Sequence, residues 1–242
     1  MRLQDQVALV TGASRGLGLA ICRSLAAEGA SLACVARPGP DLAQAVAALS
    51  ASGAQVLAAP ADVTDAVEIG AAVKATVERW GRLDIVVLNA GTWQGAPLHE
   101  TTEEMWDQLL DLTLKGAFLT LKHAIPWLVA QGRGTVVGID SLGGRVGQPG
   151  SAAYAASKWG LRGLLESAAL ELKPHRVRVS LVAPHMMNSA GRPIEPGSPE
   201  RDRSLETADV AALVAFICSA PEHVSIGNAT IWPLSTGIRS QG

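Results

Sequence analysis

The 242-residue chain has few cysteines, few aromatic residues, no long apolar run and no excess of either charge. Its three cysteines, Cys22, Cys34 and Cys218, lie far apart among apolar neighbours. That spacing fits neither a disulfide framework nor a metal site, and it predicts reduced thiols in a cytoplasmic protein without bound metal. No segment approaches the roughly 18 uninterrupted apolar residues of a membrane span, and the first residues are not apolar enough for a signal peptide.

The charge of the chain is almost balanced. Basic residues number 20 and acidic residues 22, which gives a formal net charge of −2. This balance leaves no basic stripe for nucleic acid and no acidic tail. Hydrophobic residues make up 48% of the chain, enough to form a packed core. The composition therefore predicts a soluble globular protein with neither a nucleic-acid nor a membrane partner.

Short apolar runs alternate with longer helical patterns along the chain. These runs lack polar alternation, so they predict strands buried on both faces, as in a parallel sheet covered by helices. The expected strands span residues 7–11, 31–36, 55–60, 84–89, 135–140, 177–184 and 228–233. No linker or repeat interrupts them. We therefore expect one α/β domain over residues 1–242, a Rossmann-like doubly wound sheet of seven parallel strands.

Residues at the expected helix ends support this division. Three glycines each follow a helical pattern and are expected to end it, namely Gly29, Gly53 and Gly81. Thr101 and Glu104 have the spacing of a capping box at the start of a further helix. We expect Pro126 to bend or shorten that helix, because proline lacks the backbone N–H.

The first strand is followed by the glycine-rich turn TGASRGLG, which contains Gly12, Gly16 and Gly18. Glycines between a strand and a helix let the backbone approach a pyrophosphate, which the helix N-terminus then holds. The spacing differs from the usual G-x-G-x-x-G fingerprint, and no Gly-Lys-Ser/Thr follows as in a Walker loop. Taken alone the turn could be a tight connection, but its place in a parallel α/β pattern favours nucleotide binding.

The residues near the second strand's end distinguish between two dinucleotides. An acidic residue there would hold a ribose 2′-hydroxyl and favour NAD. Here Arg37 stands at the end of that strand and Arg15 lies inside the glycine turn. Two guanidiniums suit a 2′-phosphate. The alternative is two solvated surface arginines; we predict that the cofactor is NADP(H).

The segment SAAYAASKWG holds Tyr154, the single tyrosine of the chain, four residues before Lys158. Residues i and i+4 share a helix face, so Lys158 can lie beside Tyr154 or reach past it to a cofactor ribose. A free phenol has a pKa near 10, and a nearby ammonium, together with the positive nicotinamide of NADP⁺, favours the phenolate. The alternatives are a reactive phenol and a packing aromatic with a solvated lysine nearby.

Because of these motifs, the chain resembles the short-chain dehydrogenase/reductase family, in its compact one-domain branch, from Val7 to about Pro233. TGASRGLG, Asn89-Ala90-Gly91 and Tyr154-x-x-x-Lys158 occur in that family's order and spacing, and Ser141 lies 13 residues before Tyr154. The resemblance implies these cofactor-binding residues: Gly12, Ser14, Arg15, Gly16, Leu17, Gly18, Arg37, Asp62, Val63, Asn89, Ala90, Gly91, Tyr154, Lys158, Pro184, Met187 and Ser189.

The resemblance also implies a catalytic mechanism. Tyr154 would protonate a carbonyl oxygen as NADPH delivers hydride to its carbon, and Ser141 would hold that oxygen. The ammonium of Lys158 would lie beside the phenol and favour its phenolate form. The family's fourth catalytic residue is usually an asparagine, whereas Thr113 stands in its place; we expect Thr113 to bind a relay water near Lys158.

The chain departs from the family pattern at several other positions. Asp140 stands where a serine often precedes the catalytic one. After the sixth expected strand, Pro184-His185 replaces Pro-Gly, and Ser189 replaces a threonine. The end, IWPLSTG, lacks the usual Asp-Gly-Gly. These departures leave the Ser-Tyr-Lys centre intact.

The substrate is not specified by these motifs. We expect the irregular loop at about 185–206 to cover it, with Trp93, His185, Met186 and Ser141 as contacts; Trp93 and His185 could equally be plain loop residues. Within the loop, Met186, Met187 and Ile194 offer apolar contacts, and Arg192, Arg201 and Arg203 could hold an anion.

The apolar helix over residues 151–173 carries small or apolar side chains on more than one face, which suits a helix with a second partner. The family resemblance implies a homotetramer or a homodimer. Two functions remain open. One is an NADPH-dependent carbonyl reductase, or an alcohol dehydrogenase in reverse, and the other is a catalytically impaired NADP(H)-binding regulator or scaffold.

Overall fold

A computed structural model describes residues 1–188, 194, 195 and 197–236, and all statements below concern these residues. Within them, seven parallel strands form one sheet, in the order β3-β2-β1-β4-β5-β6-β9. The strands are β1 (Val7–Thr11), β2 (Ser31–Ala36), β3 (Val56–Pro60), β4 (Ile85–Leu88), β5 (Gly134–Ile139), β6 (Val177–Pro184) and β9 (Asn228–Ile231). The predicted fold class is confirmed, and each predicted strand is present with its ends shifted by at most two residues.

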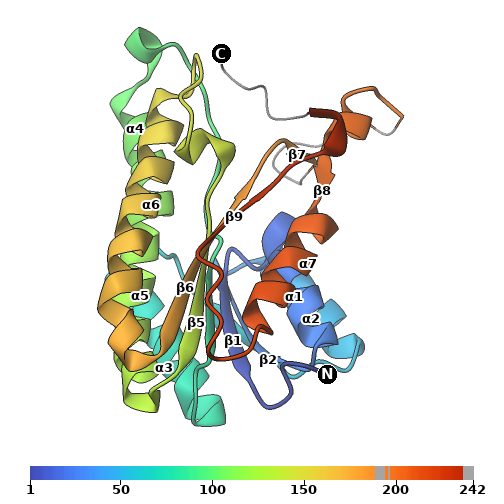
Figure 1. Cartoon of the computed structure of the whole chain (residues 1–242), viewed down its shortest axis with the longest axis vertical. Coiled ribbons are helices and arrows are strands. Elements are labelled where there is room, and N and C mark those ends of the chain that lie inside the picture. The colour runs from blue at the N-terminus through green and yellow to red at the C-terminus, as the bar shows by residue number, and fades with distance from the viewer. Residues whose placement is uncertain (189–193, 196, 237–242) are drawn as a thin grey trace.

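Helices cover both faces of this sheet (Figure 1). One face carries α1 (Gly16–Ala27), α2 (Pro40–Ala51) and α7 (Thr207–Cys218). The other carries α3 (Ala66–Trp80), α4 (Glu103–Leu110), α5 (Gly116–Gln131) and α6 (Ala152–Leu172). Strand β1 shows why both layers of helices are needed. The side chains of Ala8 and Val10 pack in the core under α1, whereas that of Leu9 packs in the core under α5 and α6.

The order of the strands creates a crevice between β1 and β4. The chain builds β2 and β3 on one side of β1 and then returns to place β4 on the other side. At such a reversal the connections leave the sheet in opposite directions, and ligands bind outside the carboxyl ends of the strands. The glycine turn after β1 and the Asn89–Gly91 segment after β4 both lie at this point.

Helix ends follow the predictions at the glycines and differ at two other places. Gly29, Gly53 and Gly81 follow α1, α2 and α3 with φ of 96°, 88° and 72°. The predicted capping box is wrong by one residue, because α4 begins at Glu103 and the Thr102 hydroxyl accepts from the Met105 N–H at 3.2 Å. A short 3-10 turn, Leu98–Glu100, sets that shift, and the Thr101 hydroxyl donates to the Pro97 carbonyl instead.

Pro126 does not shorten its helix. Helix α5 continues for five residues beyond it, to Gln131. The irregularity lies earlier, where a π-helical turn over Asp111–Lys115 joins α4 to α5. The loop after β6 also has structure that the sequence pattern did not predict. Short strands β7 (Met187–Asn188) and β8 (Leu205–Glu206) pair in parallel.

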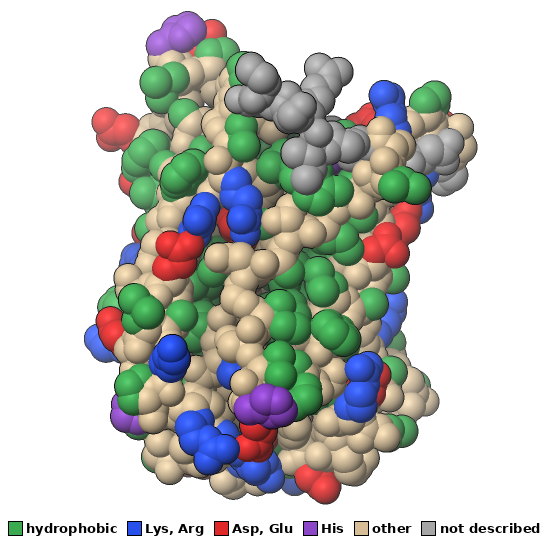
Figure 2. Space-filling view, viewed as in Figure 1, with side chains coloured by type: hydrophobic (Ala, Val, Ile, Leu, Met, Phe, Trp, Pro, Cys, Tyr) green, Lys and Arg blue, Asp and Glu red, His purple; other side chains and the backbone are tan. Residues whose placement is uncertain are grey.

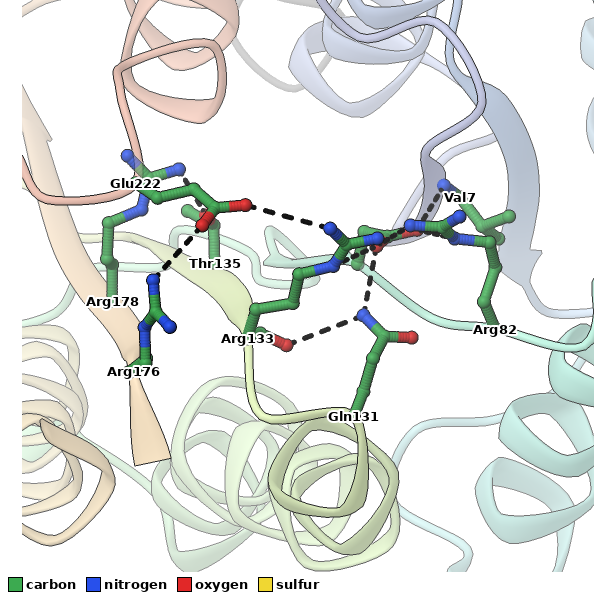
Figure 3. Close-up of polar contacts among 9 residues, drawn as sticks. Val7, Arg82, Gln131, Arg133, Thr135, Arg176, Arg178 and Glu222 are labelled. Atoms are coloured by element: carbon green, nitrogen blue, oxygen red, sulfur yellow. Dashed lines mark hydrogen bonds and ion pairs between the residues drawn. The ribbon is translucent and has the colours of Figure 1, made fainter. Parts of the chain in front are cut away.

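Ion pairs and hydrogen bonds tie the strands together at the amino end of the sheet, around a hollow of about 320 Å³ (Figure 3). The Asp84 carboxylate accepts from the Val7 N–H at 2.9 Å, from Arg82 at 2.7 Å and from the Gln131 amide at 2.9 Å. Arg178 donates to the Thr135 hydroxyl at 2.7 Å and to backbone carbonyls at the end of α7, including those of Cys218 and Ala220.

Replacing Arg178 by methionine should lower the free energy of unfolding by about 1–3 kcal/mol, because the carbonyl oxygens it serves lose their donors. Arg176→Met is the matched control. Arg176 is 73% exposed and meets Glu222 at 3.4 Å, so its loss should cost less than about 0.5 kcal/mol. Urea unfolding followed by circular dichroism measures both. Equal effects of the two substitutions would contradict the role given to Arg178.

The surface carries charges of both signs. Acidic and basic side chains are interspersed on the face shown in Figure 2. Among the helices of the described residues, none is both long and apolar enough to cross a membrane.

Candidate active site

The turn after β1 has the shape that a bound phosphate needs. Gly12 and Gly16 take φ of 66° and 55°, in the left-handed region that favours glycine. Gly18 lies so close to the turn that an added Cβ would come within 2.0 Å of the Gly12 carbonyl oxygen. Helix α1 begins at Gly16 with no side-chain cap, so the N–H groups of its first turn stay free for a ligand.

Asn89 fixes this turn against the end of β4. Its amide donates to the Thr11 carbonyl at 2.9 Å and to the Gly12 carbonyl at 3.3 Å. The Thr11 hydroxyl in turn accepts from the backbone N–H groups of Asn89 and Ala90. The residues after β1 and β4 that are predicted to bind the cofactor are therefore brought together, and Asn89 holds the glycine turn through its backbone carbonyls.

The residues predicted to distinguish the dinucleotides lie in the turn after β1 and at the end of β2, and the predicted adenine contacts Asp62 and Val63 follow β3. Arg15 and Arg37 are both exposed, and Arg37 directly follows β2. Hydrogen bonds from Thr64 hold the pKa of Asp62 below its usual value, and the charge of Arg37 adds to this. Val63, next to Asp62, is buried against Gly116, where an added Cβ would come within 2.7 Å of it. Arg37 and Asp62 thus border one edge of the crevice.

Ser141, Tyr154 and Lys158 lie together beyond the carboxyl end of β5. Ser141 begins a 3-10 turn, Leu142–Gly144, and its hydroxyl accepts from the Gly143 N–H at 3.2 Å. Gly143 leaves room for the phenol, since an added Cβ would come within 2.8 Å of the Tyr154 ring. Lys158 Nζ lies 5.9 Å from the centroid of that ring and donates to the Ile139 carbonyl at 2.8 Å. The helix spacing thus places the pair as predicted.

The proton affinities of this pair depend on burial and on the neighbouring polar groups. Burial raises the pKa of Tyr154; the Ser141 hydroxyl lowers it and the Asp140 carboxylate raises it further. Burial lowers the pKa of Lys158 to about 8, against the opposing effect of Asp140. In the protein's own groups, burial of the ring and the Asp140 carboxylate therefore oppose the predicted effect of the ammonium on the phenol. The prediction includes the positive nicotinamide of NADP⁺, so the acidity of the phenol with the cofactor bound stays a prediction.

Thr113 lies within the π-helical turn, and its hydroxyl oxygen is buried without a hydrogen-bond partner among the described residues. A Cβ added at Gly91 would lie 3.5 Å from this oxygen and 3.8 Å from Lys158 Nζ. Thr113 and Lys158 therefore border the same small space beside Gly91. An unpartnered buried hydroxyl at such a place suits an ordered water.

Beyond the carboxyl ends of β6 and β9, His185 stacks on Trp232, with ring centroids 4.8 Å apart and an interplanar angle of 25°. Burial lowers the pKa of His185, and its Nδ1 is buried without a partner in the described chain. Sequence reasoning missed Trp232. The one available signal was its position directly after the last strand, at the end of the sheet where ligands bind.

The other predicted contacts have different outcomes. Met186 and Met187 are half-buried beside Pro184 at the end of β6, whereas Trp93 is 62% exposed. Arg201 is paired with Glu206 at 2.6 Å, so it is not a free anion site. Ser189 and Arg192 lie outside the described residues. Within the described chain, no group of three or more His, Cys, Asp or Glu side chains could hold a metal ion.

Comparison with known proteins agrees with this geometry. A family model described as short chain dehydrogenase matches residues 6–193. The chain is 35% identical over 227 residues to trans-4-hydroxycyclohexanecarboxylate dehydrogenase of Sinomonas cyclohexanicum, which covers 90% of this chain and 87% of that protein. It is also 35% identical over 239 residues to glycine betaine reductase ATRR of Emericella nidulans, but spans only 19% of that longer protein.

Solved structures with bound cofactors superpose closely on the chain. A metagenomic short-chain oxidoreductase in complex with NADP has a TM-score of 0.84 at 37% identity, covering 96% of this chain and 99% of that one. Carveol dehydrogenase from Mycobacterium avium in complex with NAD has a TM-score of 0.87 at 29% identity, covering 95% and 97%. Since the family model matches most of its length and a full-length relative exceeds 30% identity, the chain belongs to the short-chain dehydrogenase family of nicotinamide-dependent oxidoreductases.

Proposed function

We propose that this protein is an NADP(H)-dependent oxidoreductase that reduces a ketone to an alcohol, or catalyses the reverse. The observation that carries this proposal is the grouping of Ser141, Tyr154 and Lys158 beyond β5, on the side of the sheet where the glycine turn also lies. A hydroxyl donor, a phenol and an ammonium held together at the mouth of a dinucleotide crevice suit proton transfer to a carbonyl oxygen.

The residues present fit a nicotinamide dinucleotide. The left-handed glycines and the free first turn of α1 would hold the pyrophosphate. Asp62 and Val63 would border the adenine, and Arg15 and Arg37 would hold a 2′-phosphate. Gly91, Lys158, Pro184 and Met187 would line the nicotinamide end. When bound, the nicotinamide supplies or accepts the hydride at the carbonyl carbon.

The chain's own residues handle the proton. In reduction, the O–H bond of the Tyr154 phenol breaks and its proton goes to the carbonyl oxygen, which becomes the alcohol hydroxyl. Ser141 donates a hydrogen bond to the same oxygen as negative charge develops on it. Lys158, next to the ring, carries the positive charge that stabilises the phenolate left behind. Oxidation reverses each of these transfers.

Thr113 is proposed to hold a water that returns a proton to this centre through Lys158. Support comes from its unpartnered hydroxyl in the space beside Gly91. Comparing the turnover of Thr113→Asn with the native chain tests this role. A large loss in the asparagine variant would show that the threonine geometry is required.

The preference for NADP(H) over NAD(H), the substrate contacts of Trp93, His185 and Met186, and the cytoplasmic location stay predictions. The same holds for the homotetramer or homodimer, which the exposed apolar side chains Phe118 and Trp159 on α5 and α6 support. Light scattering on the purified protein measures its mass, and a monomer would contradict the predicted assembly.

The proposed function is tested by NADPH oxidation with a panel of ketones and ketoacyl thioesters, and by NADP⁺ reduction with the matching alcohols. Turnover of at least one carbonyl compound, faster with NADPH than with NADH, is the expected result. Tight NADPH binding without turnover on any compound would favour the catalytically impaired scaffold instead.

A further inference from the structure

Asp140 is a buried carboxylate directly before the catalytic serine. Its side chain is 0% exposed, and its backbone N–H is fixed by the Val182 carbonyl at 2.8 Å. Neither carboxylate oxygen completes a hydrogen bond within the described residues. The nearest cation is Arg145, whose Nε lies 3.9 Å from Asp140 Oδ2. Burying a carboxylate without hydrogen bonds destabilises the folded protein. A charge kept at such a place therefore suggests a function.

The turn that positions the phenol also makes room for this carboxylate. A Cβ added at Gly144 would come within 2.1 Å of Asp140 Oδ1, and one at Gly143 would meet the Tyr154 ring. The adjacent glycines thus admit the carboxylate at one position and the phenol at the next. Lys158 also lies next to this segment, because its Nζ donates a hydrogen bond to the carbonyl of Ile139, the residue before Asp140.

The charged groups around Asp140 come from two elements. Helix α6 contributes Tyr154, Lys158 and, farther out, Arg162. The segment after β5 contributes Arg145 and the Ser141 N–H, which lowers the carboxylate's pKa, while β6 faces it with backbone. Burial raises the pKa of Asp140, but these cations oppose that effect. The carboxylate in turn raises the proton affinity of both Tyr154 and Lys158.

We propose that Asp140 is a positioning residue whose buried negative charge, balanced by Arg145, keeps Lys158 and the Tyr154 phenol protonated and so biases the site toward protonating a carbonyl. This inference rests on the proposed function for its catalytic meaning, whereas its electrostatic part can be measured without any substrate. Members of the family that this chain resembles often have a serine at this position. The proposed role of the carboxylate is therefore specific to this chain's own residues.

The test uses the single tyrosine of the chain. Ultraviolet absorbance of tyrosinate, followed against pH, reports Tyr154 alone, with circular dichroism checking that the protein stays folded. Asp140→Asn should move the ionisation of Tyr154 to lower pH than in the native chain. Glu166→Gln is the matched control, since it removes a carboxylate charge from an exposed side chain on α6, the helix that carries Tyr154, where Glu166 is paired with Arg162. It should leave the ionisation in place.

The rates of the two reaction directions give a second readout that a purely structural role would not produce. In Asp140→Asn, reduction should be at least about threefold slower at pH values between the two Tyr154 ionisations, where the native phenol is protonated and that of the variant is not, while oxidation at neutral pH becomes faster. Asp140→Ser serves if the asparagine variant does not fold, because serine is smaller and Arg145 is 23% exposed and can turn to water.

The outcomes separate the two proposals. A Tyr154 ionisation that stays in place, or moves to higher pH, in the Asp140 variants overturns the role of Asp140 whether or not the enzyme is active. A shift to lower pH that the Glu166→Gln control lacks supports that role, even if no carbonyl compound is turned over and the proposed function fails.

Discussion

Replacing Tyr154 by phenylalanine should lower carbonyl reduction by about 10³-fold while changing NADPH affinity by less than about tenfold. The substitution removes the phenol oxygen and its proton but keeps the ring that packs against Gly143. General acid catalysis by a positioned group contributes about 10²- to 10⁴-fold, so its loss should appear almost entirely in kcat. Turnover is measured with the best compound from the ketone panel, and binding by quenching of tryptophan fluorescence on NADPH addition.

Two controls belong to this experiment. The tyrosinate absorbance must disappear, because Tyr154 is the single tyrosine. Leu170→Ala, at a 76% exposed position on the same helix, should keep native turnover. Turnover within about tenfold of the native rate in Tyr154→Phe would refute the phenol as proton donor. Loss of NADPH affinity in the same variant would point to damage of the site rather than to lost proton transfer.

The parts of the fold that follow from local periodicity could be predicted from the sequence. Val7–Thr11 is buried along its whole length because helices cover the sheet on both faces. An apolar run without polar alternation is typical of a strand buried in this way. The spacing of Tyr154 and Lys158 similarly predicts their proximity, since both lie on one regular helix. The glycine turn was predictable because glycine is the residue that accepts positive φ.

Features that depend on contacts between distant segments could not be predicted. The pKa of Tyr154 depends on its burial and on Asp140, and the 13 residues between the two give no sign that their side chains lie close together. The cap of α4 moved from Thr101 to Thr102 because a preceding 3-10 turn set the direction of the chain. Trp232 reaches His185 only because β9 lies beside β6 in the sheet.

Replacing Arg37 by aspartate should reverse the preference between the two dinucleotides. Arg37 is exposed at the end of β2, where the 2′-phosphate of NADPH would lie, and hydrogen bonds between charged groups contribute about 1.5–3 kcal/mol. Their loss should weaken NADPH binding by about 10- to 100-fold. A carboxylate there can accept a hydrogen bond from the ribose 2′-hydroxyl of NADH. A gain of about three- to fivefold in NADH affinity would then shift the ratio by about 30- to 500-fold in total.

Fluorescence titration of each variant with NADPH and with NADH gives this ratio without any substrate. Arg23→Asp is the matched control, because it makes the same change of charge at an exposed position of α1 and should leave the ratio unchanged. If the native chain already binds NADH more tightly, or if Arg37→Asp and Arg23→Asp weaken NADPH equally, Arg37 is a solvated surface residue. In that case the glycine turn and Asp62 would determine dinucleotide binding, and the assignment of NADP(H) would be withdrawn.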